Sequence, residues 1–360
     1  MRHFQYFKLV LFLLIISTSL AAQNQILTSA TKKAIIDSLC TKLESHYVYP
    51  DVAKKMTEGI RNRVKNHAYD TISNGQVFAK ILTDDLHSIN QDGHLGVDYS
   101  ATLIPPEVPG EPPTQQVIDD FKKRGENDNY GFRKVEILEG NIGYLKLNAF
   151  WNGDWIKETA TGAMAFLSNT DAIILDLRDN HGFAPDGVVL IESYFFADET
   201  HMTDQINNDE HTIRQYWTLP VVPGKKLASK NLFILVSNGT FSAGEDFAYN
   251  MQAQKRATVI GETTGGGAHG TRPYRLNEHF SASIPFSYSI NPITKTDWEG
   301  KGVQPDVKVS KEQALLEAQI AALKTIIAES KNNNDRAKYL NDLLIKRQRE
   351  SEALKDGGKK

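Results

Sequence analysis

The stretch NLFILVSNGTFSAGEDFAY, residues 231–249, decides the fold because one short turn joins an apolar segment to a helical pattern. Residues 231–236 are apolar and partly β-branched, which is typical of a strand buried on both faces. Residues 243–254 then carry Phe247, Ala248 and Met251 along one face of a helix. The two segments predict a strand, turn and helix of an α/β core, with Ser242 at the N-terminus of the helix.

Ser242 has two interpretations at this position. The free amides and the positive end of the helix dipole can stabilise an oxyanion, so a serine placed there is suited to act as a nucleophile. Ser242 and Glu245 also match the capping-box pattern, which fixes the start of a helix without any chemistry. The local residues leave both interpretations open.

The first residues predict an exported protein. Basic Arg2 and Lys8 precede an apolar run at residues 9–16, and small residues end at Ala21 and Ala22. This order is typical of a secretory signal peptide. No later segment approaches the roughly 20 apolar residues of a spanning helix. We therefore expect a mature chain without a membrane span, in the periplasm or outside the cell.

Composition excludes several classes of function. The 360 residues have a formal net charge of −3 with mixed signs, which does not favour a nucleic-acid partner. The ten histidines show neither HExxH nor a tight carboxylate cluster, so we expect no metal and no other cofactor. The single cysteine, Cys40, lies in an apolar helical pattern and is expected in a core.

The pattern of apolar residues changes along the chain. It predicts N-terminal helices, then a segment with five prolines between Pro105 and Pro113, then alternating strands and helices that indicate a parallel sheet. Further strands are expected at residues 211–219 and 280–288, and a closing helix at 313–330. We divide the chain into a signal peptide (1–22), a helical bundle (23–98), a Pro-rich linker (99–130), an α/β core (131–330) and a polar, loosely attached tail (331–360).

Six segments, in this order, carry a family resemblance. They are DGHL (92–95), GNIGYLKLNAF (140–150), DLRDNHG (176–182), TFSAGEDFAY (240–249), GETTGGGAHG (261–270) and EGKGVQPDV (299–307). Together they resemble the tail-specific, or C-terminal-processing, serine peptidases. The resemblance implies a ClpP/crotonase-like α/β core behind an N-terminal helical bundle, and a serine-type peptidase that cleaves a protein or peptide substrate.

The resemblance also implies a branch of that family. Processing enzymes use a Ser-Lys dyad, but the position of the lysine, counted from Ser242, is Gly267 here. The Pro-rich stretch is too short for the PDZ domain that such enzymes hold. The chain is therefore more similar to the PDZ-less branch that includes the tricorn core protease and the interphotoreceptor retinoid-binding protein repeats.

That branch implies the candidate catalytic residues. Ser242 is the nucleophile, His94 the base and Glu299 the third member, while Gly182 and Ala243 supply the amides of the oxyanion hole. His269, in the glycine-rich loop, is the alternative base. Two other functions stay open: a binding protein for apolar ligands on the same fold, and an esterase or amidase of small substrates.

Overall fold

The computed structural model describes residues 27–106, 114–208, 210–329 and 334–357. The predicted signal peptide lies outside the described residues. Within them, no helix combines the length and apolar character that crossing a membrane requires.

A six-stranded sheet forms the centre of the protein. Its order is β11-β8-β7-β4-β3-β2, and all neighbouring pairs are parallel except β2 with β3. The strands are β2 (Phe132–Leu138), β3 (Ile142–Leu147), β4 (Ala172–Asp176), β7 (Asn231–Val236), β8 (Ala257–Gly261) and β11 (Val307–Lys308). The predicted α/β class with a parallel sheet is thus confirmed.

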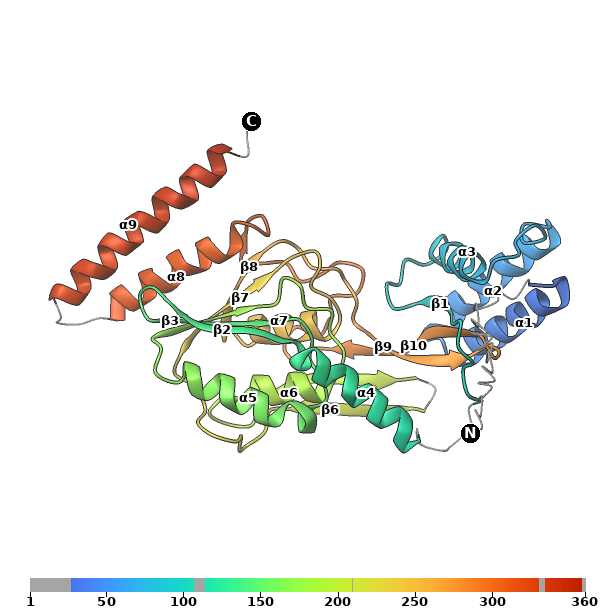
Figure 1. The fold of residues 1–360 in the computed structure, drawn as a ribbon, viewed down its shortest axis with the longest axis horizontal. Helices are drawn as coiled ribbons and strands as arrows, with labels where there is room; N and C mark the ends of the chain where they lie inside the picture. Colours follow the sequence, from blue (N-terminus) through green and yellow to red (C-terminus); the bar gives the residue numbers. More distant parts are fainter. Residues whose placement is uncertain (1–26, 107–113, 209, 330–333, 358–360) are drawn as a thin grey trace, which may run out of the picture.

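Helices cover both faces of this sheet (Figure 1). Alternate side chains of one strand point to opposite faces, so Ile173 of β4 packs in one apolar cluster and Ile174 in another. The first cluster includes α5 (Gly153–Leu167), α6 (Pro185–Ser193) and α7 (Ala243–Ala253), and the second includes α8 (Ala314–Glu329) and α9 (Asn334–Gly357).

A second sheet links the centre to the N-terminal helices. Its order is β1-β10-β5-β6, with β9 also paired to β10. Its strands are β1 (Gly96–Tyr99), β5 (His201–Asn207), β6 (Thr212–Trp217), β9 (His269–Arg275) and β10 (Phe280–Ile290). The helices α1 (Ser29–His46), α2 (Pro50–Lys65) and α3 (Gly75–His87) pack with β1 and one end of β10 in a third apolar cluster. We call these helices with β1 the N-terminal lobe.

Two helices lie where the sequence predicts irregular chain. Gln115–Asn127 forms α4 inside the expected linker, and the 3₁₀ turn Asn129–Gly131 follows it. Helix α9 lies in the expected loose tail, yet Leu340 and Leu343 are buried against Leu323 of α8. Both helices are rich in charged side chains, yet α4 has its apolar residues Val117, Ile118 and Phe121 on one face, and it is the run of prolines before α4 that favours a linker.

The parallel strands bring the site loops to one edge of the central sheet. Gly182 follows β4, Ser242 follows β7 and Gly267 follows β8. The carboxyl ends of parallel strands meet at one edge, which is where α/β proteins gather functional loops. His94 reaches the same place from the N-terminal lobe, between α3 and β1.

Candidate active site

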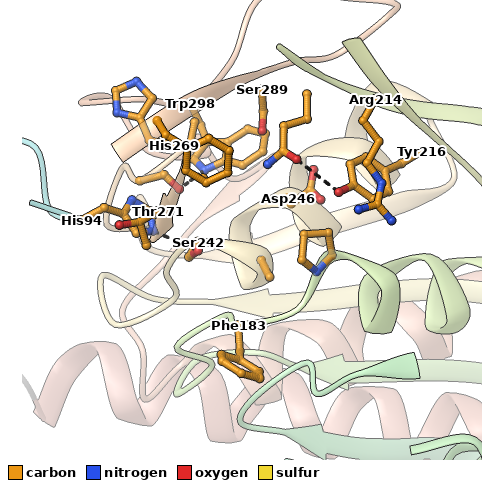
Figure 2. Close-up of a pocket in the computed structure, with 17 residues that line it drawn as sticks. His94, Phe183, Arg214, Tyr216, Ser242, Asp246, His269, Thr271, Ser289 and Trp298 are labelled. Carbon is orange, nitrogen blue, oxygen red and sulfur yellow. Dashed lines mark hydrogen bonds between the residues drawn. The ribbon is translucent and has the colours of Figure 1, made fainter. Parts of the chain in front are cut away.

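Ser242 lies directly before the first residue of α7. Its backbone adopts φ 55° and ψ −123°, a conformation that a non-glycine residue rarely takes and that often marks a functional residue. Its N–H donates to Oε2 of Glu245 at 3.0 Å, while its hydroxyl lies 3.0 Å from Nε2 of His94. The bond between Ser242 and His94 joins residues 148 positions apart and is visible in Figure 2.

His94 is held by its backbone and by one aromatic contact. Its N–H donates to Oδ1 of Asp92 at 3.0 Å, and its ring lies 4.6 Å from the ring of Phe241, centre to centre. Its Nδ1 is buried without a hydrogen-bond partner in the described part of the chain. Burial lowers the pKa of His94 to about 4, although Asp92 acts in the opposite direction. The ring is therefore neutral near pH 7, the form that accepts a proton.

His269 and Glu299 lie next to each other, and neither is hydrogen-bonded to His94. Nδ1 of His269 lies 2.8 Å from Oδ2 of Asp92 and 3.6 Å from Oε2 of Glu299. Glu299 also accepts the N–H of Ala268 at 2.5 Å. No hydrogen bond between described residues joins Glu299 to His94 or His269 to Ser242. The structure thus brings Ser242 and His94 together and places the other two in an adjacent buried cluster.

The charges of that cluster follow from its burial and its bonds. Burial opposes ionisation of both Asp92 and His269. The hydrogen bond between them nevertheless raises the pKa of His269 and lowers that of Asp92. Burial raises the pKa of Glu299 to about 7. Tyr47 donates a further hydrogen bond to Oδ2 of Asp92 at 3.0 Å. Asp92 and His269 therefore form a buried ion pair between the N-terminal lobe and β9.

The same three residues are a conceivable metal site. One ligand atom from each of Asp92, His269 and Glu299 lies within 4.8 Å of the others. Each of these atoms already has a protein partner, and the Nδ1 to Oδ2 distance of 2.8 Å is that of a direct hydrogen bond. Hydrogen bonding between protein groups accounts for the arrangement.

The two residues expected in the oxyanion hole differ in their hydrogen bonding. Ala243 is the first residue of α7, and its N–H donates no hydrogen bond to a described residue. The N–H of Gly182 instead donates to Oδ1 of Asn180 at 2.9 Å. Gly182 packs directly on the serine, since a Cβ there would lie 2.6 Å from Cβ of Ser242. The Gly182 N–H can donate to an oxyanion only after its hydrogen bond to Asn180 is broken.

Glu245 organises the glycine-rich loop as well as the start of α7. Its fully buried carboxylate accepts hydrogen bonds from the amides of Gly266 and Gly267 at 2.7 and 2.8 Å, and from the hydroxyl of Thr264. The capping-box pattern predicts only the bond to Ser242. The additional bonds tie the loop after β8 to the helix that carries the serine.

Gly267 has no room for a side chain. A Cβ at this position would lie 2.3 Å from Cζ of Phe241 and 2.7 Å from Cε1 of His94. The imidazole of His94 thus occupies the space next to the position that carries lysine in Ser-Lys enzymes. A side chain at position 267 would therefore have to displace Phe241 or His94.

Gly267→Ala should therefore slow reaction of Ser242 with a fluorophosphonate by about a hundredfold, because a catalytic group displaced by about 1 Å loses that much. The labelling rate of the purified protein measures the effect. Gly162→Ala is the matched control, since a Cβ on Gly162 of α5 meets nothing within 4 Å. Equal labelling of the Gly267 variant and the parent would contradict the placement of His94.

A cavity of about 290 Å³ opens beside Ser242. It is lined by Ser242, His94 and His269, by aromatic side chains and by polar side chains of β5, β6 and α7 (Figure 2). The lining residues used below are Gln205, Arg214, Tyr216 and Asp246. The cavity is large enough for one side chain of a ligand, and Ser242 is at its wall.

Comparison with known families agrees with this geometry. The model of peptidase family S41 matches residues 141–309, and the model of the N-terminal domain of this family in eukaryotic IRBP matches residues 17–123. The first match contains Ser242, and the second contains His94. The two matches together cover most of the chain.

Individual relatives are distant. Carboxyl-terminal-processing peptidase 2 of Arabidopsis thaliana is 27% identical over 179 residues, which are 46% of this chain and 31% of that protein. The tail-specific protease of Haemophilus influenzae is 27% identical over 135 residues, or 35% of this chain and 17% of that protein. The chain thus spans a third or less of the length of these curated relatives.

Solved structures share the fold over most of their length. A putative peptidase of Parabacteroides merdae has a TM-score of 0.56 at 18% identity, with 83% of this chain and 98% of that chain covered. A lipoprotein of Streptococcus agalactiae has a TM-score of 0.53 at 12% identity, with 82% and 96% covered. With the resemblance of its six motifs and the two model matches, the chain belongs to peptidase family S41.

Proposed function

We propose that the protein is a secreted serine peptidase that cleaves peptide bonds through an acyl-enzyme on Ser242, with His94 as the base. The observation that carries the proposal is the 3.0 Å contact between Nε2 of His94 and Oγ of Ser242. A serine hydroxyl is a weak nucleophile near pH 7 and needs an adjacent base within hydrogen-bond reach.

The mechanism uses groups of this chain alone. The Ser242 hydroxyl attacks a peptide carbonyl while the neutral His94 ring takes its proton through Nε2. His94 then returns the proton to the leaving amine, and water resolves the acyl-enzyme by the same route in reverse. The Ala243 amide donates to the developing oxyanion, and the Gly182 amide joins it once Asn180 turns away.

Glu299 and His269 act on the site indirectly in this proposal. The ion pair of Asp92 with His269, flanked by Glu299, fixes the loop whose backbone carries His94. No residue that the structure describes bonds to Nδ1 of His94, so the orientation of the ring depends on Phe241 and on the Asp92 loop. Glu299 thus acts on His94 indirectly, through His269 and Asp92.

The test is to expose the purified protein to a fluorophosphonate, map the adduct by mass spectrometry, and incubate the protein with an unfolded protein substrate. We expect one adduct, on Ser242, and cleavage of the substrate. An unlabelled protein would overturn the nucleophile. Labelling of Ser242 without peptide cleavage would identify an esterase, an amidase or a binding protein that keeps the site.

The pH dependence of labelling is a separate prediction. A histidine with an ordinary pKa near 6.5 would lose roughly twenty-five-fold in its neutral form between pH 7 and pH 5. Because burial lowers the pKa of His94 to about 4, labelling by an uncharged fluorophosphonate should fall less than twofold over the same range. The loss then comes as the pH falls through about 4. Circular dichroism at each pH verifies that the protein stays folded, and an acid limb near pH 6.5 would contradict the prediction.

Export of the mature protein belongs to the same proposal. It is supported by the signal-peptide pattern of residues 1–22. The N-terminal sequence of protein recovered from the periplasm or the medium tests it, and a mature chain that begins after Ala22 is the expected result.

A further inference from the structure

Asp246 lies one helical turn after Ser242 and lines the same cavity (Figure 2). Ser242 directly precedes α7, four residues of a helix advance about 6 Å along its axis, and both side chains line the cavity. Consider the substrate residue whose carbonyl Ser242 attacks. If the side chain of that residue runs along α7, its end lies beside Asp246. The distance suits a long side chain.

The two carboxylate oxygens of Asp246 have different surroundings. Oδ1 accepts a hydrogen bond from the Thr203 hydroxyl at 2.9 Å and another from the Asn250 side-chain amide at 3.0 Å. No described residue donates to Oδ2, and Oδ2 is not among the buried polar atoms that lack a partner. The carboxylate is thus held rigidly through one oxygen and keeps the other accessible.

The charge of Asp246 is not compensated by the protein. Burial raises its pKa to about 6, so it is still ionised at neutral pH. Its acidic neighbour Glu192 is 1% exposed, and burial together with the Asp246 charge raises the pKa of Glu192 well above the ordinary value, which favours the neutral form of Glu192. Among the described residues, no lysine, arginine or histidine forms an ion pair with Asp246.

Arg214 is the other charged side chain at this end of the cavity. It is exposed on β6, which is an edge strand, and its guanidinium lies 4.8 Å from the centre of the Tyr216 ring. Hydrogen bonds hold Asp246 in place, whereas none from a described residue holds the guanidinium of Arg214. Asp246 is the better ordered of the two, and it lies on the helix that begins at Ser242.

We propose that Asp246 makes the enzyme selective for lysine or arginine at P1, the substrate residue whose carbonyl Ser242 attacks. This inference rests on the proposed peptidase function. An ammonium or guanidinium group donates to Oδ2 and forms a charge-assisted hydrogen bond in a site partly shielded from water. A neutral side chain of equal length leaves the Asp246 charge unpaired.

The test compares three quenched fluorescent peptides that differ only at P1, which is lysine, norleucine or glutamate. We expect kcat/KM for the lysine peptide to exceed that for norleucine by about tenfold to a hundredfold, and the glutamate peptide to be the poorest. Equal values for lysine and norleucine would overturn the proposal. A preference for glutamate would also overturn it and would assign the selectivity to Arg214.

Two variants separate Asp246 from its surroundings. Asp246→Asn keeps the shape of the side chain and should lower the lysine-to-norleucine ratio by at least about tenfold. Asp204→Asn is the matched control, since Asp204 of β5 pairs with His201 and does not line the cavity, and it should keep the parent ratio. An unchanged ratio in the Asp246 variant would overturn the proposal.

The measurements distinguish this inference from the function on which it rests. If none of the peptides is cleaved, the peptidase function fails. If all are cleaved at similar rates, the peptidase function stands and the role of Asp246 fails. The parent enzyme alone decides between these outcomes, so a variant that does not fold leaves the test intact.

Discussion

Ser242→Ala should abolish covalent labelling by a fluorophosphonate and lower peptide hydrolysis by roughly 10⁴-fold or more. The reason is that no acyl-enzyme can form, while the remaining amides and the cavity still bind substrate. Labelling is read on a gel or by intact mass, and hydrolysis with the lysine peptide described above.

The stability of this variant should change little. Among the described residues, the side-chain hydrogen bond of the Ser242 hydroxyl is to His94, and the Ser242 backbone N–H bonds to Glu245 whatever the side chain is. Thermal unfolding followed by circular dichroism checks the fold. Ser168→Ala, at the C-terminal end of α5 and outside the cavity, should behave as the parent. Persistent labelling of the Ser242 variant would mean that another residue is the nucleophile.

His94→Ala should slow labelling and hydrolysis by about 10³-fold to 10⁴-fold. Its ring is the group within hydrogen-bond distance of Oγ of Ser242, and burial keeps it neutral. Loss of the ring leaves a hydroxyl without a base. The rate of inactivation by an uncharged fluorophosphonate isolates this effect from substrate binding.

His269→Asn is the matched comparison, because the asparagine amide can still donate to Asp92. Both nitrogens of His269 already have hydrogen-bond partners, Nδ1 in Asp92 and Nε2 in Tyr49. Its labelling rate should fall by about tenfold at most, whereas its unfolding midpoint should drop because a buried ion pair is lost. A larger loss of labelling in this variant than in His94→Ala would make His269 the base.

Local patterns predict the part of the site that is built locally. The strand Asn231–Val236 has the predicted first and last residues, and α7 begins at the predicted residue. Both features depend on residues that are close together in the sequence. The absence of a lysine at Gly267 is also visible in the sequence. The rings of Phe241 and His94 leave no room for a side chain at Gly267, and the contact with His94, 173 positions earlier, follows only from the fold.

The partner of Glu299 cannot be predicted from neighbouring residues. A glutamate before Gly-x-Gly carries no information on which of two histidines it will face. In the structure it faces His269, because its carboxylate is tied to the backbone of the preceding residue, Ala268. The Asp92 and His269 pair joins residues 177 positions apart, and only the Asp-x-His spacing at residues 92–94 hints that Asp92 contacts the backbone of His94.

The sequence around Asp246 does not indicate a binding residue. It sits in a helix beside Glu245, where two acids in the first turn are fully explained by the helix dipole. Its function depends on which oxygen is already bonded, and that depends on Thr203 of another sheet.

Ser242 and His94, the proposed nucleophile and base, are positioned by separate apolar clusters: α7 packs in one cluster of the central sheet, and α3 and β1 pack in that of the N-terminal lobe. Segments with separate cores can open independently, at a lower free energy than global unfolding. A transient loosening of the lobe would withdraw His94 and leave an intact but silent serine on a folded core. Heat or denaturant that loosens the lobe would then lower turnover before the whole protein unfolds.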